Sequence, residues 1–408
     1  MRRTGTAMIV SARLDPMTTP SPLPVTGAWL PGDEPGHRQF FTFATDRRFA
    51  LDCGVALSDV VVAYETWGRL DADGSNAILL CHAWTGDSHA AGPSGRGHPA
   101  PGWWDDSVGP GKPIDTDKNF VICVNSLGSC KGSTGPGSIN PKTGRQYRLS
   151  FPDLVIEDIA TAAKLVLDAL EIEQLRAMVG PSMGGMSCLA MLRKYPDLTR
   201  HFLVICSAAR AEPFAIAVRS LQREMIVRDP NWQDGAYTDE CWPETGMRLA
   251  RKLGMISYRS KEEWRERFGR DVQEHYNKRL FGMHFAVESY LENAAKKFIR
   301  NFDPCSYLYL SRAMDWFDVA DGYDDLPSAL AGINLKTSCV IGVETDILFP
   351  AYQQKEIADA IRSNGIDTSF TNLESLMGHD AFLVDHAHFN PHVTAYFERS
   401  WFDDKLQE

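Results

Sequence analysis

The stretch Leu175-Arg176-Ala177-Met178-Val179-Gly180-Pro181-Ser182-Met183-Gly184-Gly185 decides the fold. Its first five residues are apolar enough to predict a buried strand, and residues 186–192 predict a helix. G-x-S-x-G between a strand and a helix is the pattern of a nucleophile elbow, in which a strained turn exposes the serine. Gly180 and Gly184 let strand and helix pass closely, and the helix N-terminus favours developing negative charge. An ordinary glycine-rich turn is the alternative, and the strand-then-helix context favours the elbow.

Further apolar runs place the elbow in a larger sheet. Strand-like segments alternate with stretches of helical periodicity, which predicts a mostly parallel α/β sheet. The predicted strands are 40–43, 60–64, 77–81, 120–124, 175–179, 202–206, 338–343 and 367–370. The predicted helices are 156–170, 186–192, 214–227, 246–255, 261–268, 285–302 and 351–363.

A helical block rich in Arg, Trp and Tyr interrupts this alternation late in the chain. The expected organisation is therefore a flexible N-terminal arm (1–38), a first part of the core (39–210), a helical lid (211–330) and a second part of the core (331–408). The arm is inferred from its Pro- and Thr-rich composition. A loop over 127–141, rich in Gly and Ser, is long enough to suggest a functional role.

Composition narrows the classes of function. The chain has 408 residues and a net charge of −11, so nothing favours binding to nucleic acid or to an anionic membrane. No apolar run approaches the roughly 20 residues that span a bilayer, and no signal-peptide core follows Met1-Arg2-Arg3. Nine scattered cysteines favour free thiols in a reducing cytoplasm over a disulfide framework or a zinc site.

A serine nucleophile needs a base and an acid that orients the base. In sheets of this kind the three follow the chain order serine, acid, histidine. Asp346 follows the strand after the lid, with Glu344 as the fallback acid, and His379 lies in a late loop beside a glycine. The predicted catalytic set is therefore Ser182, Asp346 and His379. Taken singly, an exposed loop histidine and a helix-capping aspartate are the alternatives.

The same pattern predicts an oxyanion hole. One donor is the backbone N–H of Met183, after the nucleophile, and the second comes from the loop after an earlier central strand. We expect Trp84 N–H to be that second donor. His82 could be mistaken for a catalytic residue, but it lies where the oxyanion loop belongs.

Together, several motifs from about residue 50 to the end resemble the homoserine O-acetyltransferase family. They are His82-Ala83-Trp84-Thr85-Gly86-Asp87-Ser88-His89, Gly102-Trp103-Trp104-Asp105, Gly109-Pro110-Gly111-Lys112, Asp115-Thr116-Asp117, Gly132-Ser133-Thr134-Gly135-Pro136, Ser182-Met183-Gly184-Gly185-Met186 and Gly378-His379-Asp380-Ala381-Phe382-Leu383.

This resemblance implies an α/β-hydrolase fold whose helical lid often mediates dimers. It implies a homodimeric enzyme of methionine biosynthesis that moves an acyl group from acyl-CoA to L-homoserine, through an acyl-Ser182 intermediate. The cysteine usage adds the expectation that this enzyme is cytoplasmic. Acyl-CoA is then a co-substrate, and no cofactor or metal is implied. Arg251 matches the arginine that pairs with the substrate carboxylate, and Asp380 matches the acid that receives its ammonium group. A solvated lid charge and a helix N-cap are the respective alternatives.

The chain also departs from the typical acetyltransferase pattern. Pro181 replaces a second glycine, Trp84 replaces a leucine, and Arg219 and Ser220 stand where acidic or amide residues are usual. These features resemble the branch that uses succinyl-CoA, which includes serine O-succinyltransferases. A succinyl carboxylate left unpaired in a closed site costs roughly several kcal/mol, so Arg219 is the candidate for its partner, with a surface or dimer-facing arginine as the alternative.

The loop around residues 82–86 otherwise resembles the homoserine enzymes, so homoserine is the favoured acceptor, with succinyl slightly ahead of acetyl as the transferred group. The alternatives are transfer to serine in cysteine biosynthesis, a serine esterase with water as acceptor, and a binding protein on a hydrolase scaffold. An esterase has no need of Arg251 and Asp380 as partners for a zwitterion, and the complete Ser182, Asp346 and His379 set argues against a binding protein. The sequence shows neither metal-ligand spacing nor a nucleotide-binding glycine loop.

Overall fold

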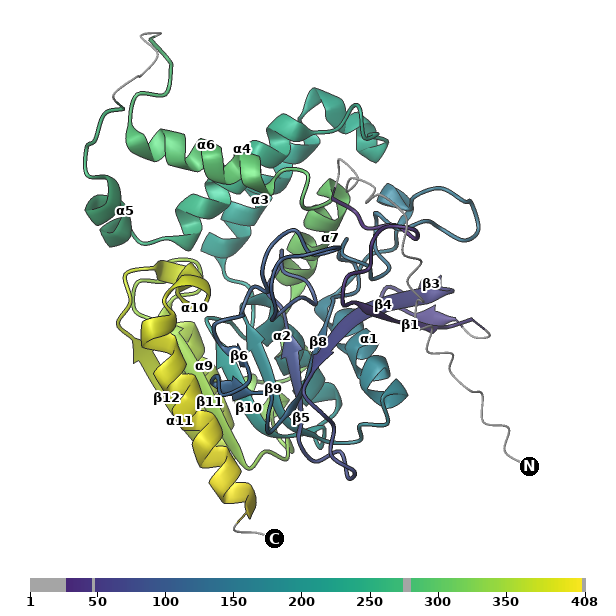
Figure 1. Ribbon diagram of the computed structural model, residues 1–408, viewed down its shortest axis with the longest axis vertical. Helices are drawn as coiled ribbons and strands as arrows, with labels where there is room; N and C mark the ends of the chain where they lie inside the picture. The colour runs from purple at the N-terminus through teal and green to yellow at the C-terminus, as the bar shows by residue number, and fades with distance from the viewer. Residues whose placement is uncertain (1–26, 46–47, 274–279, 406–408) are drawn as a thin grey trace.

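The computed structural model describes residues 27–45, 48–273 and 280–405 (Figure 1). Its centre is an eight-stranded sheet in the order β1-β4-β8-β5-β9-β10-β11-β12. Strand β4 runs antiparallel to β1 and β8, and the pairs from β8 to β12 are parallel. The strands are β1 Gln39–Phe43, β4 Val60–Trp67, β5 Ala77–Cys81, β8 Phe120–Val124, β9 Leu175–Pro181, β10 Thr199–Ile205, β11 Thr337–Val343 and β12 Asp367–Leu373. The predicted mostly parallel sheet is confirmed.

Both faces of the sheet are covered, as continuous apolar runs require. In β5, Leu79 and Cys81 pack into one core together with α1 (Ile156–Ala169), α2 (Met183–Lys194) and α9 (Ala351–Ser363). Ile78 and Leu80 face the other way, into a core with α11 (His386–Lys405). The short helix α10 (Ala381–Val384) precedes α11 and lies beside it in Figure 1.

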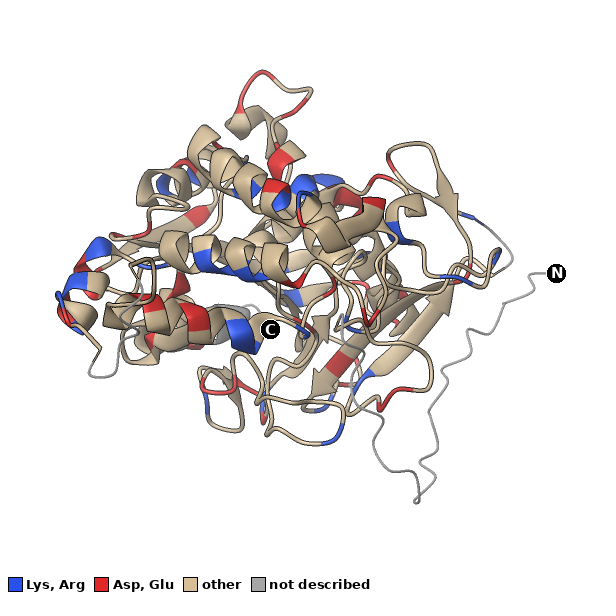
Figure 2. Cartoon of the chain, turned by 90° about the horizontal axis from the view of Figure 1, so that it is seen from above, with Lys and Arg blue, Asp and Glu red and all other residues tan. Residues whose placement is uncertain are grey.

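A helical layer stands between β10 and β11 in the chain and lies over one end of the sheet in Figure 1. This lid comprises α3 Pro213–Val227, α4 Glu244–Tyr258, α5 Lys261–Phe268 and α6 Ala286–Phe298, followed by α7 Pro304–Trp316 and α8 Leu326–Ala329 closer to the core. Figure 2 shows acidic and basic residues interspersed over these helices.

The remaining elements are short. Two small two-stranded sheets pair β2 (Phe49–Ala50) with β3 (Ala56–Leu57) and β6 (Val108–Gly109) with β7 (Ile114–Asp115). In the described part of the chain the 3₁₀ helices are η1 Arg148–Ser150, η2 Pro230–Gly235 and η3 Gly378–Asp380. No described helix is both long and apolar enough to cross a bilayer.

Two expectations about segments differ from the structure. The helix expected over 285–302 ends at Phe298, because Arg300 has a left-handed backbone (φ 71°) and Asp303 caps a new helix, α7. The expected flexible arm lies partly outside the described residues, since residues 1–26 are not described. Residues 27–38 are packed: Ala28 is 1% exposed, and Trp29 N–H donates to Cys130 O at 2.8 Å.

Candidate active site

Ser182 occupies the sharp turn between β9 and α2. Its backbone has φ 53° and ψ −124°, a conformation that non-glycine residues rarely adopt. Its N–H donates to Ile205 O at 2.9 Å, and its carbonyl accepts from Ser207 Oγ at 2.7 Å. A Cβ at Gly184 would lie 1.9 Å from Cys81 O, and one at Gly180 would lie 2.4 Å from Gly184 O. The glycines are therefore required by backbone contact, and the surrounding hydrogen bonds fix the strained serine.

His379 lies between the serine and a carboxylate. Ser182 Oγ is 2.9 Å from His379 Nε2, and Asp346 Oδ2 is 2.7 Å from His379 Nδ1. A carboxylate can only accept, so the proton sits on Nδ1 and Nε2 is free to accept the serine hydroxyl proton. Asp346 is itself oriented, because its Oδ1 accepts the backbone N–H groups of Leu348 and Phe349 at 2.8 and 2.9 Å.

The charge environment makes His379 a stronger base. Burial lowers its pKa, but the neighbouring Asp346 carboxylate raises it by charge and hydrogen bonding, and the net result is a raised pKa. The imidazolium that forms when His379 takes a proton is thus stabilised by Asp346.

Strand ends bring these residues together. Ser182 follows β9, Asp346 follows β11, and His379 follows β12 in η3. The carboxyl ends of parallel strands share one edge of the sheet, where α/β proteins place their sites. Glu344, the fallback acid, is exposed, and Asp346 contacts the histidine instead.

Trp84 and Met183 lie at the same edge. Trp84 follows β5 and lines the cavity in front of Ser182, and Met183 is the first residue of α2. Within the described residues, neither backbone N–H has an assigned hydrogen-bond partner, so both are available to a ligand oxygen. His82 is fully buried and shapes the loop instead of reacting. Its Nε2 accepts from Ser126 N–H at 2.9 Å, and its Nδ1–H donates to Ala83 O at 2.8 Å.

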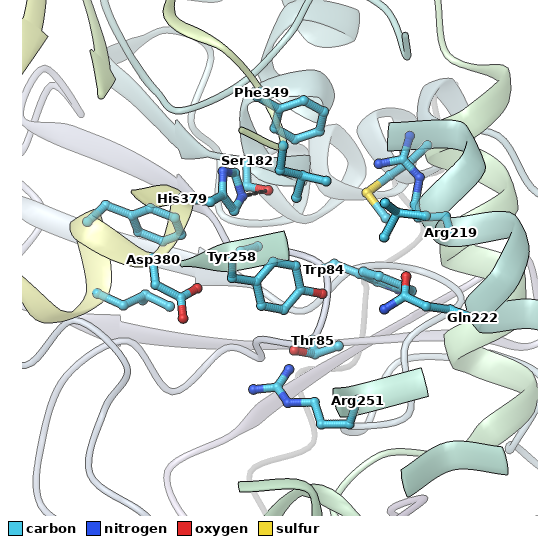
Figure 3. Close-up of a pocket in the computed structure, with 16 residues that line it drawn as sticks. Trp84, Thr85, Ser182, Arg219, Gln222, Arg251, Tyr258, Phe349, His379 and Asp380 are labelled. Atoms are coloured by element: carbon cyan, nitrogen blue, oxygen red, sulfur yellow. Dashed lines mark hydrogen bonds between the residues drawn. The ribbon is translucent and has the colours of Figure 1, made fainter. Parts of the chain in front are cut away.

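A cavity of about 110 Å³ opens in front of Ser182 and His379 (Figure 3). Helix α3 contributes Arg219 and Gln222, and helix α4 contributes Arg251 and Tyr258. The apolar part of the wall comprises Ala83, Val218, Met314, Leu348, Phe349, Phe382 and Leu383. The lid therefore supplies polar groups that face the nucleophile from the opposite side.

Arg219 is buried in this wall, 2% exposed. Its Nε donates to Asp315 Oδ1 at 2.5 Å, whereas its Nη2 has no hydrogen-bond partner among the described residues. Burial lowers the pKa of Arg219 and Asp315 opposes this effect, but an arginine keeps its charge in proteins. The guanidinium is thus held by one carboxylate and has a donor left over for a ligand.

Arg251 and Asp380 also line the cavity. Arg251 lies over the Phe298 ring, 4.4 Å from its centroid, and pairs with no carboxylate in the described part of the chain. Asp380 Oδ2 accepts from Arg259 Nε at 3.1 Å. In Figure 3, Asp380 lies to the left of Tyr258 and Arg251 lies below it, so an amino acid bound beside Tyr258 would meet both an anion and a cation.

Gln222, Tyr258 and Arg259 also lie at the site, although no sequence motif predicts them. A signal was present for two of them: Gln222 follows Arg219 by one helical turn, and Tyr258 follows Arg251 by two, so each shares a helix face with a predicted site residue. The pairing of Arg259 with Asp380 joins a lid helix to the histidine loop, and nothing local in the sequence marks it.

The structure also assembles three buried side chains that could ligate a metal: Glu65, His89 and His98. The two imidazole rings stack nearly parallel, with centroids 3.7 Å apart and a 12° interplanar angle, so their in-plane lone pairs cannot converge on one ion. His89 Nδ1 donates to Glu65 Oε2 at 2.9 Å, and His98 Nε2 accepts from His37 N–H at 3.0 Å. The geometry is that of a hydrogen-bonded network.

Comparisons with known proteins identify the relatives of this chain. A family model described as alpha/beta hydrolase fold matches residues 76–385. A serine O-succinyltransferase of Stenotrophomonas maltophilia (strain K279a) is 54% identical over 353 residues, covering 86% of this chain and 95% of the relative. The solved homoserine O-acetyltransferase from Bacillus anthracis is 28% identical, with a TM-score of 0.81 over 88% of this chain and 96% of that chain.

The chain belongs to the homoserine O-acetyltransferase family of α/β hydrolases. It is an acyltransferase, as the resemblance implied. The solved esterase E22 is also similar to this acyltransferase, at 29% identity and a TM-score of 0.79 over 88% of this chain and 99% of that chain. The fold therefore accommodates both transfer and hydrolysis, and residues around the nucleophile must distinguish them.

Proposed function

We propose that this acyltransferase moves a succinyl group from succinyl-CoA to the side-chain hydroxyl of L-serine. One observation carries the proposal: two arginines, Arg219 and Arg251, line the cavity of Ser182 and His379, and each has a guanidinium nitrogen without a partner among the described residues. One cation suits the succinyl carboxylate and the other suits the amino acid's α-carboxylate. The names of the relatives at 50–54% identity support both substrates.

The first half-reaction uses the catalytic set. Ser182 Oγ attacks the thioester carbonyl while His379 Nε2 takes its proton, and the carbonyl oxygen receives the N–H groups of Trp84 and Met183. The C–S bond then breaks, the proton passes from His379 to the departing CoA sulfur, and succinyl-Ser182 remains.

In the second half-reaction the amino acid's hydroxyl is the attacking group and Ser182 Oγ is the leaving group. The amino acid's hydroxyl oxygen attacks the succinyl-Ser182 carbonyl carbon while His379 takes the hydroxyl proton. The bond between that carbon and Ser182 Oγ then breaks, His379 returns the proton to Ser182 Oγ, and the O-succinyl amino acid leaves. Arg251 binds the α-carboxylate and Asp380 the α-ammonium, which orients the hydroxyl. Such positioning of the acceptor favours it over water.

Serine and homoserine differ by one methylene, which is worth only about 1–3 kcal/mol in an apolar pocket. The loop at residues 82–86 favoured homoserine and methionine biosynthesis, whereas the named relatives at 50–54% identity favour serine and therefore cysteine biosynthesis. We take serine as the acceptor, with homoserine as the competitor.

The test is release of CoA thiol by the purified protein with succinyl-CoA or acetyl-CoA, each paired with L-serine or L-homoserine. We expect the succinyl-CoA and serine pair to give the highest kcat/KM, and Ser182→Ala to abolish the release. Preference for homoserine or acetyl-CoA would correct the substrate and keep the mechanism. Release that ignores the amino acid would contradict the transferase proposal.

Hydrolysis is the second candidate, favoured by the similarity to esterase E22. In Arg251→Gln we expect the KM for serine to rise about tenfold or more, the effect of losing a charge-assisted hydrogen bond. Hydrolysis of p-nitrophenyl acetate should change by less than about threefold, since this ester has no carboxylate to bind. Equal effects on both reactions would favour an esterase.

We further propose a cytoplasmic homodimer that forms through the lid. Exposed apolar side chains on the lid support the interface: Phe214, Leu221, Leu249, Ile256, Leu280 and Phe281 are 40–95% exposed. Light scattering on the purified protein should give twice the 45.5 kDa chain mass, and a monomer at micromolar concentration would contradict this.

A further inference from the structure

A second cavity adjoins the active site. Its volume is about 280 Å³, and it shares Thr85 and Arg251 with the cavity of Ser182. Its outer lining includes the exposed residues Pro99, Ala100 and Asn301, so it reaches the surface. A ligand in this cavity can therefore extend from solvent past Thr85 toward the nucleophile.

Cations dominate this second cavity although the whole chain carries a net charge of −11. Among the described residues that line it, Arg38, Lys131 and Arg251 are cationic and one, Asp87, carries a carboxylate. Asp87 already pairs with Arg38, whose Nη2 lies 3.3 Å from Asp87 Oδ2. Lys131 also acts on Asp87, since its charge helps to lower the pKa of that carboxyl. Three positive charges thus face one carboxylate in the described lining, which favours an anionic ligand.

Arg38 is built into the cavity wall. It is 8% exposed, and its Nη1 donates to Gly97 O at 2.9 Å. Its Nε has no hydrogen-bond partner in the described part of the chain. A buried donor of this kind is expected to have a partner, and a ligand oxygen in the cavity would supply one.

The two stacked histidines add donors. His98 Nε2 accepts from His37 N–H, so its proton is on Nδ1, which has no partner among the described residues. His89 Nε2 is likewise unpartnered. Burial lowers the pKa of His89, but the hydrogen bond to Glu65 and the charge of Glu65 raise it by more than burial lowers it. The pKa of His89 is therefore raised overall, which favours a proton on Nε2. Both histidines are at most 3% exposed and line the cavity.

We infer that this cavity binds the phosphate groups of the CoA donor, while its thioester reaches Ser182 past Thr85. The inference rests on the proposed function, which requires an acyl-CoA at Ser182. Phosphate oxygens are multiply charged acceptors and match a wall of arginine, lysine and histidine donors. Trp29, Trp103 and Phe298 supply apolar surface for the arm between the thioester and the phosphates. Because CoA leaves before the amino acid reacts, Arg251 can contact the donor and then the acceptor in turn.

Lys131 offers the cleanest test. It is half-buried, and within the described residues its Nζ makes one hydrogen-bond contact, a long one of 3.4 Å to Gly27 O, so removing its charge should leave the fold intact. Lys164 on α1 is a matched control, since it is also half-buried and lies outside both cavities. The variants are Lys131→Gln, Lys131→Arg and Lys164→Gln.

The donors compared are succinyl-CoA and the succinyl thioester of N-acetylcysteamine, which keeps the acyl group and lacks phosphates. We expect Lys131→Gln to raise the KM for succinyl-CoA about tenfold and to leave the KM values for the truncated donor and for serine within about twofold. Lys131→Arg should retain affinity, Lys164→Gln should behave as wild type, and added salt should weaken succinyl-CoA binding in the wild type. Equal changes for both donors, or no change for succinyl-CoA, would overturn the inference.

Direct binding separates this inference from the proposed function. If no donor supports transfer to an amino acid, calorimetric titration of free CoA and of pantetheine still decides the site. Binding of CoA that Lys131→Gln weakens, with pantetheine unaffected, supports the phosphate site without acyl transfer. Wild-type and Lys131→Gln proteins that bind CoA equally, or no CoA binding at all, would overturn it.

Discussion

The hydrogen bond from His379 Nδ1 to Asp346 is the contact that sets the pH dependence. The neighbouring carboxylate gives a raised pKa at His379, whose ordinary value is near 6.5. Catalysis needs the neutral imidazole, so kcat/KM should fall with decreasing pH through an apparent pKa above about 6.5. In Asp346→Asn this pKa should drop, moving the acid limb to lower pH, and the plateau rate should fall by about 10⁴-fold because the tautomer is lost.

A pH profile of kcat/KM from pH 5 to 9 for both proteins is the measurement. Ser182→Ala gives the background rate at each pH. An acid limb that stays in place in Asp346→Asn would mean that Asp346 does not govern the protonation of His379.

Comparing Arg219 with Arg223 distinguishes a contact to the succinyl group from a structural role around Asp315. Both contact Asp315, but Arg219 lines the active-site cavity and Arg223 does not. In Arg219→Gln we expect kcat/KM for succinyl-CoA to fall by about 10–100-fold, the loss of one buried charge-assisted contact, with acetyl-CoA changed by less than about threefold. Arg223→Gln disturbs the same aspartate and should leave the ratio of the two donors unchanged. If both variants alter the ratio alike, the Asp315 cluster acts structurally and Arg219 is not the acyl contact.

At the scale of an element, the elbow depends on backbone contact. Gly184→Ala would place a methyl group 1.9 Å from Cys81 O, a clash with a main-chain atom that cannot rotate away. We expect α2 to be displaced from β5, thermal stability to fall and thiol release to be lost. Gly95→Ala is the control, because nothing lies within 4 Å of that Cβ and its φ is not positive. A Gly184→Ala protein with wild-type melting temperature and activity would refute this account of the turn.

The sequence predicts best where one local pattern determines the structure. Continuous apolar runs identified the central strands β5, β8, β9, β10 and β11, because buried parallel strands are apolar on both faces. Helix α7 was not predicted, although Asp303-Pro304 is a capping residue followed by proline at the first helical position. The antiparallel direction of β4 also followed from no local signal, since apolar alternation does not encode strand direction.

In the candidate site, too, some residues follow from local sequence patterns and others do not. Ser182, Met183, Asp346 and His379 lie just after strands, so the elbow motif, the chain order and the strand ends point to them. Only the choice of Asp346 over Glu344 remained open in the sequence. Arg219 and Arg251 required a family resemblance, because a lid helix with a charged face has the same pattern whether it faces solvent or substrate. The second cavity, next to the active site, is lined by residues from the N-terminal segment, two loops and two lid helices. No spacing in the sequence reveals such a set.

At the scale of the whole molecule, two sets of buried contacts hold the lid over the sheet. On one side, Arg259 after α4 donates to Asp380, and Ser260 Oγ donates to Leu376 O at 2.5 Å. A Cβ at Gly378 would lie 2.8 Å from Tyr258 O, so the end of α4 packs directly on the histidine loop. The position of the lid and the position of the catalytic histidine are therefore set by the same contacts.

On the other side, Asp303 joins three segments that are distant in sequence. Its Oδ1 accepts from Arg148 Nη1 at 2.9 Å and from the Tyr237 hydroxyl at 2.6 Å, and its Oδ2 accepts from Ser306 N–H at 2.9 Å. The side chain is completely buried, and the Arg148 side chain is 13% exposed. The core loop before α1, the link between α3 and α4, and the start of α7 thus meet at one carboxylate.

Removing that carboxylate should loosen the whole assembly, because it leaves a mostly buried guanidinium unpaired and also deletes a helix cap. We expect Asp303→Ala to reduce the free energy of unfolding by about 3–5 kcal/mol, seen as a lower urea midpoint. Asp325→Ala removes an equivalent N-cap from α8, where the side chain accepts from Ser328 N–H at the surface, and its loss should be clearly smaller. Equal losses in the two variants would show that Asp303 acts as a cap alone, and the buried junction would then not be what fixes the lid to the core.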